Sequence, residues 1–280
     1  MILDTASVIF TLGPQGTFSD EAAHKAFPSP PKVHYTRTFQ EALRLTTQTP
    51  ESVCVVPVEN SVAGTIASVQ DSLVAENLTV LQEVIVPVQY SLFLQGALDL
   101  AGECFAHPQA FEQTSQFLSE HLPQARCIFS DSNIDSGVRF LKQAQDPNFA
   151  GAAVVPSSFG RQHPQWVRFE DIQDYANNTT RFLVVRRRQE SEHFDFSKQK
   201  TSLFVEFQED RPGLLYEMLS IFNRYGVNLC RLESRPSKSI PWAYVFYVDF
   251  YNHPEVEACL EALGQAWFRL RVLGSYDRIS

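Results

Sequence analysis

Two glycine-containing turns stand directly before segments with helical periodicity. The first turn is Gly13-Pro14-Gln15-Gly16, followed by Thr17 and Ser19, and the second is Gly64-Thr65. The first turn of a helix has backbone N–H groups without helical partners and carries the positive end of the helix dipole. Such a turn suits a carboxylate, and the hydroxyls of Thr17, Ser19 and Thr65 add further donors. These residues therefore predict recognition of carboxylate groups.

An alternation of strand and helix patterns positions these turns. Strands are predicted at Val8 to Leu12, Val53 to Val58, Cys104 to Ala106, Arg126 to Phe129 and Ala152 to Val155. Helical apolar periods follow most of them, which predicts α/β layers with mainly parallel sheets. The βα rhythm falls into two blocks joined by the apolar stretch Thr79 to Leu94. Two blocks of this kind indicate two lobes facing a cleft, with ligand-binding loops at 13–19, 59–65 and 130–133.

The C-terminal part has a different order of elements. The pattern predicts strand Thr201 to Phe207, helix Pro212 to Tyr225, strands Val227 to Glu233 and Trp242 to Phe250, helix Pro254 to Ala266 and strand Phe268 to Tyr276. This βαββαβ order is that of a ferredoxin-like α+β plait. Polar residues 189–199 predict a linker between residues 1–188 and residues 200–280. The run Arg186-Arg187-Arg188 before it is interpreted as a solvated strand end rather than a binding patch.

Composition excludes several classes of protein. A length of 280 residues with 44% hydrophobic and 20% charged residues is typical of a folded protein with two domains. No apolar run approaches the length of a membrane span, and no secretory leader is evident, so we expect a cytoplasmic protein. The net charge of -9 argues against nucleic acid. The five cysteines and seven histidines are scattered, so we predict neither a metal site nor any other cofactor.

Five sequence blocks together resemble one known family. Four of them resemble, in order, the signature blocks of the prephenate dehydratases, and the fifth resembles the phenylalanine-site motif of their ACT domain. The blocks are Gly13 to Ser19, Val56-Pro57-Val58-Glu59-Asn60-Ser61 with Gly64, His107-Pro108-Gln109-Ala110, Asn178-Thr179-Thr180-Arg181-Phe182, and Glu233-Ser234-Arg235-Pro236. The resemblance implies a two-lobed catalytic domain similar to periplasmic binding proteins, followed by a ferredoxin-like ACT domain. It begins at the first strand, so we expect a monofunctional dehydratase without a chorismate mutase domain.

The resemblance also implies an activity. Enzymes of this family convert prephenate into phenylpyruvate in phenylalanine biosynthesis, expelling carbon dioxide and water. By resemblance, Thr180 protonates the departing hydroxyl, Arg181 pairs with a carboxylate and Asn60 contacts the substrate. Along an extended segment, successive side chains point to opposite faces, so Arg181 could instead brace the segment from behind. The other residues carried over as substrate-binding are Thr17, Ser19, Ser61, Gly64, Thr65, Gln109, Ser132 and Phe182.

One carried-over position has two candidates. The chain departs from the family pattern around Ser132-Asn133-Ile134, so Ser130 is the rival of Ser132 as the substrate-binding serine. Arogenate dehydratase, which performs the same elimination on an amino analogue of prephenate, stays open as an alternative activity. A second alternative is a non-catalytic protein that senses amino acids.

ACT domains of the family bind phenylalanine between subunits, which implies feedback regulation and a homodimer or homotetramer. The positions that match the family's phenylalanine site are Gly213, Leu214, Leu215, Asn228, Glu233, Ser234, Arg235 and Pro236. Leu214 stands where the family has a smaller residue, so it could narrow the pocket or merely repack it. The resemblance thus implies one substrate, one allosteric amino acid and no nucleic-acid or membrane partner.

Overall fold

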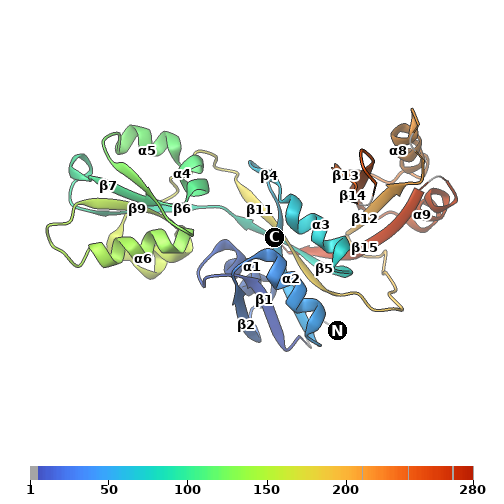
Figure 1. Ribbon diagram of the computed structural model, residues 1–280, viewed down its shortest axis with the longest axis horizontal. Coiled ribbons are helices and arrows are strands. Elements are labelled where there is room, and N and C mark those ends of the chain that lie inside the picture. The colour runs from blue at the N-terminus through green and yellow to red at the C-terminus, as the bar shows by residue number, and fades with distance from the viewer. Residues whose placement is uncertain (1–5, 210, 239, 267, 280) are drawn as a thin grey trace.

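The computed structural model describes residues 6–209, 211–238, 240–266 and 268–279, which form two α/β lobes and a C-terminal α+β unit (Figure 1). The first lobe contains β1 (Val8–Leu12), α1 (Phe18–Ala26), β2 (Lys32–Thr36), α2 (Phe39–Gln48), β3 (Ser52–Asn60), β4 (Gly64–Thr65), α3 (Ala67–Ala75), β5 (Leu78–Pro87) and β11 (Thr179–Arg187). Strand β3 is apolar on both faces and almost wholly buried, because α1 covers one face of the sheet and α2 and α3 cover the other.

The second lobe contains the remaining elements of the N-terminal two thirds. They are β6 (Tyr90–Gln95), the 3-10 turn η2 (Leu98–Leu100), β7 (Glu103–Ala106), α4 (Pro108–Gln113), α5 (Ser115–His121), β8 (Arg126–Phe129), α6 (Asn133–Gln143), β9 (Gly151–Pro156), α7 (Ser157–Gln162), η3 (Pro164–Trp166) and β10 (Val167–Phe169). Within the described chain its sheet has the order β10-β6-β9-β7-β8. The chain passes between the lobes twice, from β5 to β6 and from β10 to β11, which confirms the predicted two-lobed arrangement.

The sheets are mixed rather than mainly parallel as predicted. In the first lobe β1 is parallel to β2 and β3, but β11 lies antiparallel between β3 and β5. In the second lobe β7 is parallel to β8 and β9, whereas β6 runs antiparallel to β9 and β10. The antiparallel strands arise because the connections between lobes bring the chain back in the opposite direction. The sequence pattern missed β2, whose burial is largely partial, and the short β10.

The C-terminal unit has the predicted βαββαβ order. It consists of β12 (Lys200–Phe207), α8 (Leu214–Arg224), β13 (Leu229–Pro236), β14 (Tyr244–Tyr251), α9 (Val256–Gln265) and β15 (Phe268–Ile279). Its strands have the order β13-β14-β12-β15. Apolar side chains of α8 and α9, including Met218, Phe222 and Leu263, pack against the sheet in one buried cluster. The ferredoxin-like plait is therefore confirmed.

The C-terminal sheet continues into the sheet of the first lobe. The end of β15 pairs in parallel with β5, where Asp277 lies opposite Gln82 and Ile279 opposite Val84. Among the described residues this joins ten strands into one sheet, in the order β13-β14-β12-β15-β5-β11-β3-β1-β2 with β4 beside β3. Figure 1 shows β15 running from the C-terminal unit back to β5 in the middle of the molecule. The C-terminal unit is thus joined to the first lobe by backbone hydrogen bonds as well as by the linker.

Gly274 permits the close approach of β15 to β5. A Cβ atom at Gly274 would lie 2.2 Å from the carbonyl oxygen of Val80. The register of β15 against β12 also shifts here, between the pairs of Ser202 and Leu203. A glycine at such a place commonly marks a bulge or a close contact between backbones.

Gly274→Ala is therefore expected to push β15 away from β5 and to lower the free energy of unfolding by about 1–3 kcal/mol, the range for overpacked sites. Urea unfolding followed by circular dichroism measures the change. Gly264→Ala is the matched control, because a Cβ at Gly264 in α9 meets no atom within 4 Å. Equal stability of the two variants would contradict the tight contact.

Candidate active site

A cleft of about 600 Å³ opens between the two lobes. The first lobe contributes the turn after β1, the segment after β2, the β3–β4 loop and the start of β11. The second lobe contributes the start of β6, the N-terminus of α4 and the N-terminus of α6. The polar residues that line the cleft are Thr17, Ser19, Arg37, Asn60, Thr65, Tyr90, His107, Gln109, Gln113, Asp131, Ser132, Asn133 and Thr180. Gly64 and Phe182 line it as well.

Asn60 and Thr180 meet in the lining of the cleft. Asn60 is the last residue of β3 and pairs with Thr180 of β11 across the antiparallel ladder. The Oδ1 of Asn60 accepts hydrogen bonds from the N–H groups of Val62 (3.0 Å) and Ala63 (2.8 Å), which fixes the orientation of the amide. The Nδ2 then donates to the Oγ1 of Thr180 at 3.0 Å and to the Oδ1 of Asn178 at 2.7 Å.

This arrangement determines what the Thr180 hydroxyl can do. Its oxygen already accepts a hydrogen bond from an amide, so its proton is available for an acceptor in the cleft. Thr180 and Asn60 are only 8% and 5% exposed, so the hydrogen bond between them is largely buried. The pair therefore presents one oriented O–H donor.

The sequence predicts that the N-terminus of α1 binds a substrate carboxylate, but side chains of the protein already occupy several of its hydrogen-bonding groups. The hydroxyl of Thr17 caps the helix by accepting from the N–H of Asp20 and donates to the carbonyl of Pro14 at 3.0 Å. The carboxylate of Asp20 accepts from the N–H of Gly16 at 2.8 Å and from the hydroxyl of Tyr35 at 2.6 Å. The helix end thus already holds a carboxylate of the protein, although Thr17 and Ser19 both line the cleft.

The β3–β4 loop is tied to the C-terminal unit. Gly64 has a φ of 81°, a conformation that favours glycine, and places Thr65 at the cleft. The Oγ1 of Thr65 donates to Glu233 at 3.1 Å and accepts from Arg231 at 2.9 Å. Ser61 is exposed and does not line the cleft. Its hydroxyl oxygen instead accepts a hydrogen bond from the N–H of Thr179 at 2.9 Å.

The second lobe places Ser132, rather than Ser130, at the cleft. Ser132 caps α6 by accepting from the N–H of Asp135 at 3.0 Å. Ser130 is 5% exposed and hydrogen-bonds to the hydroxyl of Ser136 at 2.6 Å, away from the lining. His107 caps α4 at the N–H of Gln109, and burial lowers the pKa of this imidazole below its ordinary value. His107 is therefore neutral at pH 7.

Arg181 does not face the cleft, which corrects its predicted contact with a substrate carboxylate. Side chains alternate along β11, so Arg181 points to the opposite face from Thr180. Its Nε donates to Glu83 at 2.6 Å, and its two terminal nitrogens donate to Asp249 at 2.5 Å and to the hydroxyl of Tyr276 at 2.9 Å. The geometry fits the alternative that this arginine braces the segment from behind.

The cluster around Arg181 is buried and pairs acidic with basic side chains. Burial opposes the charge of Arg181, but Asp249, Tyr276 and Glu83 raise its pKa well above the ordinary value. Burial also acts against the charge of Asp249, yet Arg181 and Arg231 hold its pKa below the ordinary value. Lys200 adds a second cation by donating to Glu83 at 2.8 Å. Residues of the first lobe and of the C-terminal unit thus neutralise each other inside the structure.

Three polar residues of the cleft lie outside the blocks and loops that the sequence analysis predicted: Arg37, Tyr90 and Gln113. Arg37 directly follows β2, whose alternating Val33 and Tyr35 are the signal that would have marked the following loop. Tyr90 begins β6 and donates its hydroxyl to Gln113 at 3.2 Å, a contact between distant segments that no local pattern indicates.

Comparison with known families identifies the chain. A family model described as prephenate dehydratase matches residues 9–190, and one described as ACT domain matches residues 201–268. The chain belongs to the prephenate dehydratase family. The first match covers both lobes and the cleft, and the second covers most of the C-terminal unit, which is hereafter the ACT domain.

Two relatives support this assignment to the prephenate dehydratase family. The chain is 28% identical to the prephenate dehydratase of Methanocaldococcus jannaschii, over 96% of this chain and 97% of that protein. It is 31% identical to the bifunctional chorismate mutase/prephenate dehydratase of Pseudomonas aeruginosa, over 95% of this chain and 72% of that protein.

Solved structures agree with the fold of this family member. Prephenate dehydratase from Arthrobacter aurescens in complex with L-Phe superposes with a TM-score of 0.82 at 29% identity, covering 97% of this chain and 90% of that one. The prephenate dehydratase from Staphylococcus aureus superposes with a TM-score of 0.81 at 25% identity, covering 96% of this chain and 99% of that one. A structure described as GqqA, a quorum quenching acylase, superposes with a TM-score of 0.80 at 22% identity, covering 97% of this chain and 98% of that one. At this identity the likeness shows a shared fold only.

The ACT residues carried over from the family do not all lie together in this chain. Leu214 is 2% exposed in the domain core, and Glu233 and Arg235 face the first lobe. Arg235 reaches Asp71 of α3 at 3.2 Å. The other five positions are exposed: Gly213, Leu215, Asn228, Ser234 and Pro236. Along β13 the alternation of side chains separates Glu233 and Arg235 from Ser234 and Pro236.

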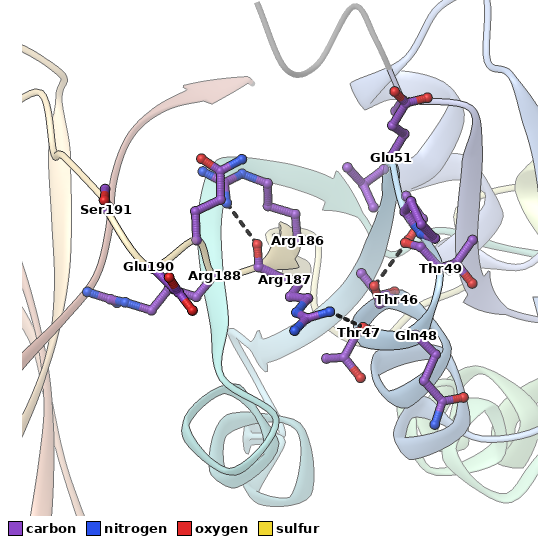
Figure 2. A pocket seen from close by; sticks show the side chains of 15 residues that line it. Thr46, Thr47, Gln48, Thr49, Glu51, Arg186, Arg187, Arg188, Glu190 and Ser191 are labelled. Atoms are coloured by element: carbon purple, nitrogen blue, oxygen red, sulfur yellow. Dashed lines mark hydrogen bonds between the residues drawn. The ribbon is translucent and has the colours of Figure 1, made fainter.

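A second cavity, of about 680 Å³, lies where β11 leads into the linker (Figure 2). Its three consecutive arginines are already engaged. Arg186 is buried and pairs with Glu192 at 2.6 Å, which corrects its interpretation as a solvated residue. Arg187 donates to the carbonyl of Thr47, and Arg188 donates to the carbonyl of Val272 at 2.6 Å. We therefore assign the chemistry to the cleft between the lobes.

No group of residues able to hold a metal ion is found in the described part of the chain. Its helices include none that is both long and apolar enough to span a membrane.

Arg181→Met is expected to lower the free energy of unfolding by about 3–5 kcal/mol, because it leaves Glu83 and Asp249 as buried charges without their main partner. Chemical denaturation measures the loss. Arg139→Met is the control, since Arg139 pairs with Asp135 at the surface and such pairs contribute about 0–1 kcal/mol. A small effect at both positions would show that the buried cluster does not hold the domains together.

Proposed function

We propose that this chain catalyses the decarboxylating dehydration of prephenate to phenylpyruvate. The oriented Thr180 hydroxyl in the cleft of a prephenate dehydratase fold is the observation that supports the proposal most directly. The name shared by relatives that cover nearly the whole chain supports it as well. The cleft volume of about 600 Å³ lies within the usual range of small-molecule sites.

The reaction requires little from the protein beyond placement and one proton. The bond between the ring and its carboxylate breaks, and its electron pair moves through the ring as carbon dioxide leaves. The ring C–O bond breaks at the other end, and the departing hydroxyl takes a proton to become water. Aromatisation drives both cleavages, so neither an oxidant nor a metal is needed for the electrons and atoms to balance.

Thr180 supplies that proton in the proposed mechanism. An alcohol is a weak acid, so it can act only while the leaving oxygen gains basicity in the transition state. Asn60 assists because its amide donates to the Thr180 oxygen and stabilises the negative charge that develops there. The alkoxide is then reprotonated from solvent. Orientation and prearranged donors therefore supply most of the acceleration.

Thr180→Ala is expected to lower kcat by about a hundredfold or more, the scale for loss of a general acid. Absorbance of phenylpyruvate in alkali measures turnover of prephenate. Thr180→Ser keeps the hydroxyl and should retain much of the activity, and Thr179→Ala alters the neighbouring residue on the other face. Wild-type turnover in Thr180→Ala would rule out Thr180 as the proton donor. Assaying the wild type with arogenate in place of prephenate shows which of the two substrates it prefers.

Phenylalanine is the proposed allosteric ligand. The ACT match and the L-Phe complex of the Arthrobacter protein support it. Contacts between the ACT domain and the cleft supply a physical route: Glu233 holds Thr65, Arg231 lies 3.3 Å from Glu59, and Asp249 holds Arg181 beside Thr180. A ligand that shifts β13 or β14 would shift these partners with it.

A homodimer or homotetramer, located in the cytoplasm, is the proposed working form. Strand β13 is an edge of the long sheet, and its alternate residues are exposed. Several large apolar side chains of the ACT domain are exposed, among them Leu215, Tyr216, Leu232 and Trp242. An unpaired edge beside exposed apolar residues favours pairing with a second copy. The five free cysteines fit a reducing compartment.

Millimolar phenylalanine is expected to lower dehydratase activity, raise the thermal midpoint and favour a larger oligomer, because it binds a closed and less active state. Initial rates, differential scanning fluorimetry and light scattering measure the three effects. Alanine at the same concentration is the control ligand. Unchanged activity together with an unchanged thermal midpoint would contradict the proposal.

A further inference from the structure

The proposed substrate carries two carboxylates, but the described residues that line the cleft carry little positive charge. His107 is neutral because burial lowers its pKa. Among the lining residues the charged side chains are Arg37 and Asp131, one of each sign. Asp131 is 97% exposed and lies 3.7 Å from Arg139, so it points toward solvent. Arg37 is thus the cation that a bound anion would meet.

Other donors that could neutralise a carboxylate are already in use. Arg181 is held by Glu83 and Asp249 behind β11. The N-terminus of α1 holds the carboxylate of Asp20, which adds a negative charge close to the cleft. The hydroxyl of Thr65 donates to Glu233. These contacts leave the guanidinium of Arg37 as the strongest available carboxylate partner in the cleft.

The backbone of Arg37 is fixed although its side chain is not. The N–H of Arg37 donates to the carboxylate of Glu41 at 2.9 Å, and the next residue, Thr38, caps α2 at the N–H of Glu41. The preceding residue, Thr36, accepts at its carbonyl from the N–H of Gly13 at 3.0 Å. This capping box and backbone bond anchor Arg37 beside the turn after β1.

The Arg37 side chain itself is exposed. No hydrogen bond or ion pair joins its guanidinium to any residue that the structure describes. Its five N–H donors are therefore free to meet a ligand, whereas the base of the side chain is held in place.

We propose that Arg37 binds the side-chain carboxylate of the substrate, the one that remains in the product. This inference rests on the proposed dehydratase function. A planar guanidinium matches a carboxylate through two parallel hydrogen bonds. Arg37 then sets the distance between the retained carboxylate and Thr180, so that the ring hydroxyl lies at the oriented O–H donor.

The chemistry distinguishes the two carboxylates. The departing carboxylate loses its charge as it becomes carbon dioxide, so a cation bound to it would stabilise the reactant more than the transition state and would slow the reaction. The retained carboxylate keeps its charge throughout, so a cation there binds reactant and transition state equally. Loss of such uniform binding raises KM and leaves kcat nearly unchanged.

The experiment compares Arg37→Gln, Arg37→Lys and Arg44→Gln with the wild type, using prephenate as substrate and phenylpyruvate as a binding probe. Arg44 is a matched control, because it is an exposed arginine of α2 that hydrogen-bonds to Gln48 and does not line the cleft. Arg37→Gln should raise KM by roughly 10- to 100-fold with kcat within about twofold, the scale for a charge-assisted pair.

Arg37→Lys keeps the positive charge but cannot make two parallel hydrogen bonds to a carboxylate. Its KM should lie between that of the wild type and that of Arg37→Gln. Calorimetry should show that phenylpyruvate, which has only the retained carboxylate, loses affinity by a similar factor in Arg37→Gln. Raised ionic strength should increase KM less in that variant than in the wild type, because a charged contact has been removed.

The outcomes separate this inference from the proposed function. A wild type without turnover of prephenate would overturn the dehydratase proposal itself. Turnover in the wild type, together with unchanged KM and unchanged phenylpyruvate affinity in Arg37→Gln, would overturn the role of Arg37 alone. A higher kcat in Arg37→Gln would instead place the guanidinium on the departing carboxylate and would also refute the assignment made here.

Discussion

The buried ion cluster centred on Arg181 is the interaction on which the rest of the structure depends. Each charge that leaves water costs several kcal/mol, and only a full set of partners offsets that cost. Glu83 comes from the first lobe, whereas Asp249, Tyr276 and Lys200 come from the ACT domain. The cluster is satisfied only when the two parts are docked, so it specifies their relative position in a way that apolar contacts alone do not.

The same strand connects this cluster to the chemistry. Thr180 and Arg181 are neighbours on β11, one facing the cleft and the other facing the ACT domain. A rigid strand transmits a displacement of one residue to the next, so the position of Asp249 bears on the direction of the Thr180 hydroxyl. Thr65 provides a parallel connection through Glu233. The cleft is therefore supported from behind by the domain that is proposed to regulate it.

Local sequence patterns predicted the elements well because their causes are local. Thr38 caps α2 and apolar residues recur along α8 at helical spacing, and both signals lie within a few residues. The pairing of β15 with β5 and the partners of Arg181 arise from residues far apart in sequence, so no periodicity reports them. Arg37 was missed because an exposed arginine after a weakly patterned strand looks like an ordinary surface charge. The cleft residues were found mainly where they belong to a recognisable block of sequence.

The parallel pairing of β5 with β15 has a consequence for how the chain folds during synthesis. Strand β5 lies between β11 and β15, so one of its edges stays open until the end of the ACT domain has left the ribosome. Until then Glu83 and Arg181 have only each other, because their further partners Lys200 and Asp249 are not yet docked. Contacts of such high sequence separation form late. The sheet of the first lobe is thus completed by the ACT domain, and a nascent chain gains the full support of its cleft only when that domain has been made.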